Sequence, residues 1–156
     1  MRSVQGPDST PARLTVDPDF RPREAGDGDE FFANGIFEFN VTRLLHYLRA
    51  SQRFHARFVA LEELSHTIGS SHLDESAIAA ADLSRPVILA EIAPGRFNLI
   101  DGNHRLASAR RTGAAGIPAY QIRCPEHLAF LTSTAAYMAY VDYWNRKVDE
   151  FAAQRA

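Results

Sequence analysis

The stretch "FNLIDGNHRLASARRTGAAGIPAY", residues 97–120, places an aspartate, a glycine, an asparagine, a histidine and an arginine consecutively between two apolar segments. Its apolar start, residues 97–100, is typical of a buried strand, and the segment after the polar cluster carries a leucine and alanines among helix-favouring arginines. Gly113 is a helix stop, and residues 117–122 read as a second strand, near whose start Pro118 is tolerated. The stretch therefore predicts a strand, a tight turn, a helix and a second strand.

The polar cluster falls on the turn, so the helix should begin at Gly102 or Asn103. The first N–H groups of a helix have no intrahelical acceptor and lie at the positive end of its dipole, which predicts an anion-binding site. Gly102 lets the backbone approach a ligand, Asn103 can cap the helix, and Arg105 offers a planar set of donors that suits phosphate oxygens. His104 can donate or exchange a proton near pH 7. Asp101 would repel a phosphate unless a divalent cation or a substrate hydroxyl lay between them, so it is a candidate metal ligand or general base.

A purely structural turn accounts for the same residues equally well. Asp-Gly-Asn is a common turn sequence, and Arg105 can pair with Asp101 or with the acidic N-terminal segment. The pattern alone leaves both interpretations open.

The composition indicates one globular domain. The chain has 156 residues, of which 46% are hydrophobic, which is enough for a single core. The single cysteine, Cys124, excludes an internal disulfide and is expected to be a small core residue. The net charge of −2 gives no strong basic footprint for nucleic acid. Because no apolar run approaches the ~20 residues that span a bilayer, we expect a cytoplasmic protein with no membrane partner.

The organisation of the chain changes near residue 30. Residues 1–30 hold four of the eight prolines and seven acids against four arginines, which predicts a tail, with residues 14–16 as a short extended piece on the domain. Residues 31–156 are expected to form the domain. Its other expected elements are a helix from Val41 capped by Asn40, strands at 57–64 and 85–92, a short helix at 73–82, a hairpin turn at 93–96 and a long amphipathic C-terminal helix that buries Tyr137, Tyr140, Val141, Trp144, Val148 and Phe151.

Residues 85–122 resemble the ParB and sulfiredoxin superfamily, small α/β proteins in which a glycine-arginine turn at a helix N-terminus holds nucleotide phosphates. The match runs through "RPVILAEIAPGRFNLIDGNHRLASARRTGAAGIPAYQI", with a weaker match in the helix at 41–49. The turn is most similar to that of the free serine kinases of this fold, which read "VDGHHR" where this chain reads "IDGNHR". The resemblance implies Asp101 in the position of the catalytic aspartate and phosphate contacts from Gly102, Asn103, His104 and Arg105. The expected fold class is α/β (α+β), a small mixed sheet with flanking helices and a long C-terminal helix.

Three departures narrow what the resemblance implies. Sulfiredoxins read "GCHR" and use that cysteine as the reactive thiol, whereas this chain has Asn103 there, so sulfinic-acid repair is not expected. ParB proteins follow this domain with a helix-turn-helix DNA reader, and the residues after 122 leave room for little beyond a terminal helix. The kinases also use a glutamate from the N-terminal half of the chain, for which Glu38 in "NGIFEFN" is our candidate.

The leading hypothesis is a small phosphotransferase or nucleotide hydrolase. Its catalytic candidates are Asp101, Glu38 and His104, and Asp101 is also the candidate Mg²⁺ ligand. The expected ligands are ATP, ADP or CTP together with a small-molecule acceptor. A second hypothesis is a non-catalytic module that senses a nucleotide and signals through the terminal helix, which is also the expected surface of a homodimer. A third, a DNA-associated or nuclease-like protein, ranks last.

Overall fold

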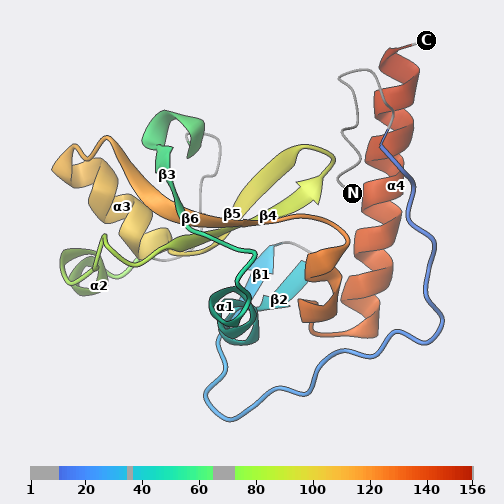
Figure 1. Cartoon of the computed structure of the whole chain (residues 1–156), viewed down its shortest axis with the longest axis horizontal. Coiled ribbons are helices and arrows are strands. Elements are labelled where there is room, and N and C mark those ends of the chain that lie inside the picture. The colour runs from blue at the N-terminus through green and yellow to red at the C-terminus, as the bar shows by residue number, and fades with distance from the viewer. Residues whose placement is uncertain (1–10, 35–36, 65–72, 156) are drawn as a thin grey trace.

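The structure is a computed structural model and describes residues 11–34, 37–64 and 73–155. In these residues the chain has an α+β fold with two sheets and a long C-terminal helix (Figure 1), as the sequence predicts. The elements in chain order are β1 (Phe31–Asn34), β2 (Phe37–Asn40), α1 (Val41–Ala50), β3 (Arg57–Ala60), the 3₁₀ helix η1 (Leu61–Leu64), α2 (Glu75–Ala79), β4 (Val87–Ala93), β5 (Arg96–Asp101), α3 (Asn103–Thr112), β6 (Gly116–Ile122), the 3₁₀ helix η2 (Glu126–Phe130) and α4 (Thr134–Gln154).

The main sheet is mixed and has the strand order β3-β6-β4-β5. β4 runs parallel to β6, while β5 and β3 are antiparallel to their neighbours. β4 and β5 form the expected hairpin, in which Gly95 has a φ of 74°. Two parallel strands need a crossover connection, and the chain between β4 and β6 provides it through β5 and α3. The predicted strand, turn, helix and strand of residues 97–122 are therefore confirmed.

Each face of the main sheet carries its own hydrophobic core. The face that includes Ile88, Ile100 and Ile122 packs against α1, α4 and β2. The opposite face, which includes Leu89 and Leu99, packs against α3 and η1. Alternation along β4 produces this division, because successive side chains of a strand point to opposite faces.

Side-chain caps set the starts of α1 and α4. The Asn40 side chain accepts a hydrogen bond from the Arg43 N–H at 3.0 Å, and the Ser133 hydroxyl accepts one from the Ala136 N–H at 3.0 Å. The cap expected from Asn40 is thus confirmed. α4 buries the aromatic face that its periodicity predicts: Tyr137, Tyr140, Val141, Trp144 and Val148 are buried and Phe151 is half-buried. This face packs on the core of the same chain.

Two local predictions need correction. The strand expected over residues 57–64 ends at Ala60, and η1 follows it. Ala60 pairs with Gly116, the first residue of β6, and the chain then enters the 3₁₀ helix at Leu61. The helix expected over 73–82 is limited to α2, which Asp74 caps through the Ser76 N–H at 2.9 Å.

A second, two-stranded sheet was not anticipated from the sequence. β1 and β2 pair antiparallel, with Phe32 opposite Phe39 and Ala33 opposite Glu38. Phe39 also bridges to Leu131, which ties this hairpin to the segment before α4. The available signal was the Asn-Gly dipeptide at 34–35 between two aromatic runs, which favours a hairpin turn.

The N-terminal segment, described from residue 11, has no helix or strand between residues 11 and 30 and lies along α4 (Figure 1). The side-chain amide of Asn145 on α4 forms two hydrogen bonds with the backbone of Leu14. Its Oδ1 accepts from the Leu14 N–H at 2.7 Å, and its Nδ2 donates to the Leu14 carbonyl at 2.9 Å. Further along, the ring of Phe20 stacks on Tyr137 with centroids 4.0 Å apart. The expected contact of residue 14 with the domain is present.

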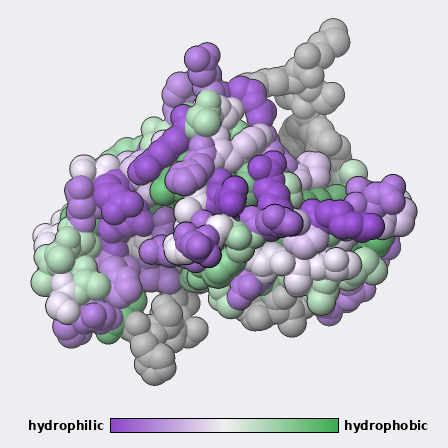
Figure 2. All heavy atoms as spheres, turned by 90° about the horizontal axis from the view of Figure 1, so that it is seen from below, coloured by the Kyte–Doolittle hydropathy of each residue, from purple (hydrophilic) through white to green (hydrophobic). Residues whose placement is uncertain are grey.

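The surface agrees with the moderate hydropathy of the chain. Hydrophilic side chains predominate over the middle of the face shown in Figure 2, which looks at the molecule from below the view of Figure 1. Among the residues that the structure describes, no helix is both long and apolar enough to cross a membrane.

Candidate functional site

The turn between β5 and α3 requires a glycine at position 102. Gly102 has a φ of 110°, a backbone conformation that side chains with a Cβ rarely adopt. A Cβ there would lie 2.3 Å from Cγ1 of Val87, at the start of the neighbouring strand β4. The turn is thus held tightly against the sheet, and this close approach to β4 is possible only because residue 102 has no side chain.

α3 begins where the sequence predicts, but its cap differs from our expectation. Gly102 is the N-cap residue and Asn103 is the first residue of the helix. Asn103 therefore does not cap the helix, because the sharp turn at Gly102 already brings the chain into helical geometry at residue 103. The N–H of Leu106 donates to the Gly102 carbonyl at 2.9 Å, so the N–H groups of the preceding residues have no acceptor within the helix.

Arg105 is held by the protein on one side. Its Nη2 donates to Oδ2 of Asp101 at 3.1 Å, and its Nη1 donates to the carbonyls of Arg85 at 3.1 Å and Pro86 at 2.6 Å. The bond between Arg105 and Asp101 is the one expected if the turn has a purely structural role, which is one of the two interpretations that the sequence left open. A guanidinium has five N–H donors, so the three bonds leave two donors for a ligand. The Arg105 side chain is 14% exposed and that of Asp101 is 22% exposed.

His104 is anchored to the segment before α2. Its Nε2 accepts a hydrogen bond from the Asp74 N–H at 3.2 Å. A nitrogen that accepts carries no proton, so in this arrangement Nδ1 is the ring nitrogen that can donate. His104 therefore orients the start of α2 relative to α3, and only Nδ1 is left to donate to a ligand.

A cavity of about 440 Å³ lies in front of the N-terminus of α3. It separates α3 from α1, the helix in which the sequence shows its weaker match to the ParB and sulfiredoxin superfamily. Three arginines and two histidines line it, against two carboxylates. The lining residues are Glu30, Val41, Thr42, Leu45, His46, Arg49, Arg85, Asp101, Gly102, Asn103, His104 and Arg105. All five residues of the Asp101–Arg105 turn thus face one cavity with an excess of basic groups.

Several of these residues were missed by the sequence reasoning. Arg49 and Arg85 were not singled out, and His46 was given no role in the site. Thr42, His46 and Arg49 recur at the helical spacing i, i+4 and i+7 on α1, beside its buried stripe. That second stripe was the available signal. Arg85 has no comparable signal, because only the pairing of β4 with β5 brings it to the turn.

Glu38 is not brought to this cavity. It lines another cavity, of about 520 Å³, together with Arg23 and Thr132, and its Oε1 accepts a hydrogen bond from the Thr132 hydroxyl at 2.7 Å. Our candidate for the kinase glutamate therefore lies apart from Asp101. The acid of the N-terminal half that shares a cavity with Asp101 is Glu30.

Two carboxylates, those of Asp101 and Glu30, line the cavity. No group of three or more His, Cys, Asp or Glu side chains with metal-ligand geometry occurs in the described part of the chain. Mg²⁺ is commonly bound by one or two carboxylates plus the phosphates of its substrate. Asp101 and Glu30 are the two carboxylates of the cavity that can act in this way.

Cys124 lies outside this site and is a poor nucleophile. Burial raises the pKa of its thiol to about 11, so the thiol stays protonated at neutral pH. It packs beside the buried Tyr140, whose hydroxyl donates to the Glu91 carbonyl at 2.8 Å. Cys124 is half-buried at the edge of the core and gives this chain no reactive thiol.

No protein-family model, no curated protein and no solved structure matches this chain. The similarity to the ParB and sulfiredoxin superfamily therefore remains a prediction from the "IDGNHR" turn and the order of elements around it. What the chain does has to be inferred from the geometry of the cavity.

Proposed function

We propose that this protein binds the phosphate groups of a nucleotide in the cavity between α1 and the N-terminus of α3. The observation that carries the proposal is the convergence of three arginines on the open end of a helix. Arg49, Arg85 and Arg105 line the same cavity as the Gly102 turn. The N–H groups of the first turn of a helix attract anions, and guanidinium groups match phosphate oxygens with two parallel hydrogen bonds.

The three arginines would play different roles. The Arg105 guanidinium is already oriented by Asp101 and by the carbonyls of residues 85 and 86, so little entropy is lost when its remaining donors meet a phosphate. Arg49 and Arg85 are exposed, and the positive charge of Arg85 also acts on the nearby Asp82. They approach the cavity from α1 and from the segment before β4, and can close on a ligand from two sides.

Phosphoryl transfer or nucleotide hydrolysis is the chemistry we propose for this site. The bond from Arg105 engages Oδ2 of Asp101, which leaves Oδ1 to accept a proton from an attacking hydroxyl or water. Mg²⁺, when it arrives with the nucleotide, would neutralise phosphate charge next to Asp101 and Glu30. Glu38 has no role in this proposal.

Thermal unfolding in the presence of nucleotides tests the proposal. ATP, ADP, CTP and GTP should each be added with and without Mg²⁺, with adenosine and cytidine as controls that lack phosphate. A ligand at about 100 times its Kd stabilises the folded state by about 2.7 kcal/mol, which for a domain of this size raises Tm by roughly 5–10 °C. At least one nucleotide should do so, and its nucleoside should not. If none of the four nucleotides raises Tm, the proposal is contradicted.

A further inference from the structure

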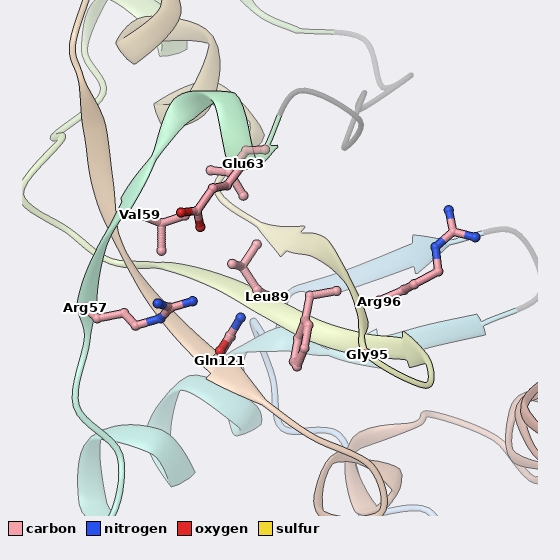
Figure 3. Close-up of a pocket in the computed structure, with 9 residues that line it drawn as sticks. Arg57, Val59, Glu63, Leu89, Gly95, Arg96 and Gln121 are labelled. Atoms are coloured by element: carbon pink, nitrogen blue, oxygen red, sulfur yellow. The ribbon is translucent and has the colours of Figure 1, made fainter. Parts of the chain in front are cut away.

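A second cavity lies at the opposite end of β5 from the Gly102 turn. β5 runs from Arg96, which lines this cavity, to Asp101, which lines the phosphate site. The cavity has a volume of about 440 Å³ and is bounded by β3, η1 and the β4–β5 hairpin (Figure 3). Its lining residues are Arg57, Val59, Glu63, Leu64, Leu89, Gly95, Arg96, Phe97 and Gln121. A volume of this size is within the range of small-molecule sites.

The floor of this cavity is apolar. Leu89 and Val59 are only 3% and 2% exposed, and both belong to the core between the sheet and α3. Phe97 adds an aromatic ring, which the guanidinium of Arg123 covers at 5.7 Å from the ring centroid. A ligand here would therefore place an apolar or aromatic group against the sheet.

Three polar side chains converge over this floor from three different elements. Figure 3 shows Arg57 from β3, Glu63 from η1 and Gln121 from β6 pointing into the cavity, whereas the side chain of Arg96 extends away from them. Arg57 and Glu63 carry opposite charges, yet they form no ion pair with each other or with another of the described residues.

The fold fixes the two segments that carry these charges. β3 is fixed by its pairing with β6, in which Arg57 lies opposite Ala119. η1 is fixed at both ends, because the Leu61 N–H donates to the Ala115 carbonyl at 3.1 Å and Arg110 donates to the Leu64 carbonyl at 3.0 Å. The backbone positions of Arg57 and Glu63 are thus fixed on either side of an apolar floor, and their exposed side chains can reach a ligand between them.

We propose that this cavity binds a free α-amino acid with an apolar or aromatic side chain. Such a ligand is a zwitterion: its carboxylate would accept hydrogen bonds from Arg57, and its ammonium would donate to Glu63. The Gln121 amide can donate to the carboxylate or accept from the ammonium, and the side chain would lie against Leu89 and Phe97. The site is separate from the phosphate site and does not depend on the proposed function.

Calorimetric titration with matched ligands tests this proposal. L-phenylalanine and L-leucine are the probes, while 3-phenylpropionate lacks the ammonium and 2-phenylethylamine lacks the carboxylate. At least one amino acid should bind saturably, and the analogue lacking either charge should bind about tenfold more weakly or worse. No saturation with either amino acid up to about 10 mM, or equal affinity for 3-phenylpropionate, would overturn the proposal.

Variants of the two charged walls provide the second arm. Glu63→Gln and Arg57→Gln should each weaken amino-acid binding by about tenfold, because each removes one charged partner of the ligand. Glu62→Gln, on the same 3₁₀ helix but outside the cavity lining, is the matched control and should leave the affinity unchanged. Wild-type affinity in both Glu63→Gln and Arg57→Gln would refute the assignment. The change in Tm caused by nucleotides should be the same in all three variants. The amino-acid site and the phosphate site are thus tested independently.

Discussion

Arg105 donates a hydrogen bond from Nη2 to Oδ2 of Asp101 at 3.1 Å, across one turn at the start of α3. The two candidate residues of the phosphate site are therefore partners in the protein before any ligand binds. Both side chains are less than a quarter exposed, at 14% and 22%, so the pair is shielded from solvent more than a surface ion pair is. Any test of one residue has to consider the other.

Substitutions of this pair should separate binding, catalysis and stability. Arg105→Ala removes a charged donor from bound phosphate and should weaken nucleotide binding by about 1.5–3 kcal/mol. Asp101→Asn removes negative charge near a phosphate, so affinity measured without Mg²⁺ should stay equal or improve slightly, while turnover is lost if Asp101 is the base. Titration calorimetry and a steady-state assay measure the two effects.

The same variants also test the structural role of the pair. Because the side chains are bonded to each other, urea unfolding of both single variants and the double variant should show a coupling of at least about 0.5 kcal/mol. If the losses of unfolding free energy in the single variants simply add in the double variant, the bond between Asp101 and Arg105 contributes nothing to stability in solution. If both substitutions lower stability alike and neither changes nucleotide affinity or turnover, the pair is purely structural and the enzymatic proposal fails.

Gly102→Ala should be among the more damaging single-methyl changes in this chain. It forces a positive φ on a residue with a Cβ, which costs about 1–2 kcal/mol, and it drives that Cβ into Val87, which costs about 1–3 kcal/mol more. Gly95→Ala is the matched control, because Gly95 has a φ of 74° but no atom within 4 Å of an added Cβ. Denaturant unfolding should show a larger loss for Gly102→Ala. Equal losses would contradict the close packing of the turn on β4.

Stability should fall in mild acid because of one buried histidine. Burial lowers the pKa of His127 from 6.5 to about 4, and its Nε2 lies 2.6 Å from the Glu91 carbonyl, to which it donates. The unfolded chain binds this proton at a higher pH than the folded one, so stability is complete above about pH 6.5 and falls as the pH drops toward 4. At about 1.4 kcal/mol per pKa unit, the loss is about 3 kcal/mol.

His127→Phe is the control for this pH dependence. The variant keeps an aromatic ring in the core but cannot titrate, and it loses the bond to the Glu91 carbonyl. Its stability should therefore be lower at pH 7 and nearly flat between pH 6.5 and 4.5, as followed by urea unfolding. A wild-type curve that is equally flat in this window would mean that His127 is not buried in its neutral form.

The N-terminal segment should be released when its clamp on α4 is removed. Asn145→Ala deletes both hydrogen bonds to the Leu14 backbone, and limited proteolysis within residues 11–23 should become about tenfold faster. Asp149→Ala removes only an exposed ion pair with Arg13 and should change the cleavage rate little. Equal rates in wild type and Asn145→Ala would show that the segment does not depend on this contact.

The parts of the fold that the sequence predicts well are those with local signals. The 97–122 unit has its own turn, helix stop and apolar runs, and α1 and α4 have caps and helical periodicity. β3 was predicted too long, because its end is set by where β6 begins, and this pairing is not visible in the local pattern. The β1–β2 hairpin was missed since its aromatic residues merge with the start of α1.

The candidate site was predictable only along one segment. The Asp101–Arg105 turn is contiguous, so its chemistry is visible in the sequence. Arg49 and Arg85 join it through packing of α1 and pairing of β4, and the carbonyl partners of Arg105 come from residues 85 and 86. The choice of Glu38 failed for the same reason, because β2 directs it toward Thr132 in another cavity.

The most direct test of the phosphate site uses Arg49 and Arg85, the two arginines that line the cavity from outside the Asp101–Arg105 turn. Nucleotide affinity should be measured by calorimetry for wild type, Arg49→Ala and Arg85→Ala, with Arg146→Ala on α4 as the control outside the cavity. Arg105 bonds the backbone carbonyl of residue 85, so Arg85→Ala leaves that contact in place. We predict that Arg49→Ala and Arg85→Ala each lose about 1.5–3 kcal/mol of nucleotide binding, while Arg146→Ala loses none. Saturable binding that is equally strong in all four proteins would contradict a phosphate site at the N-terminus of α3.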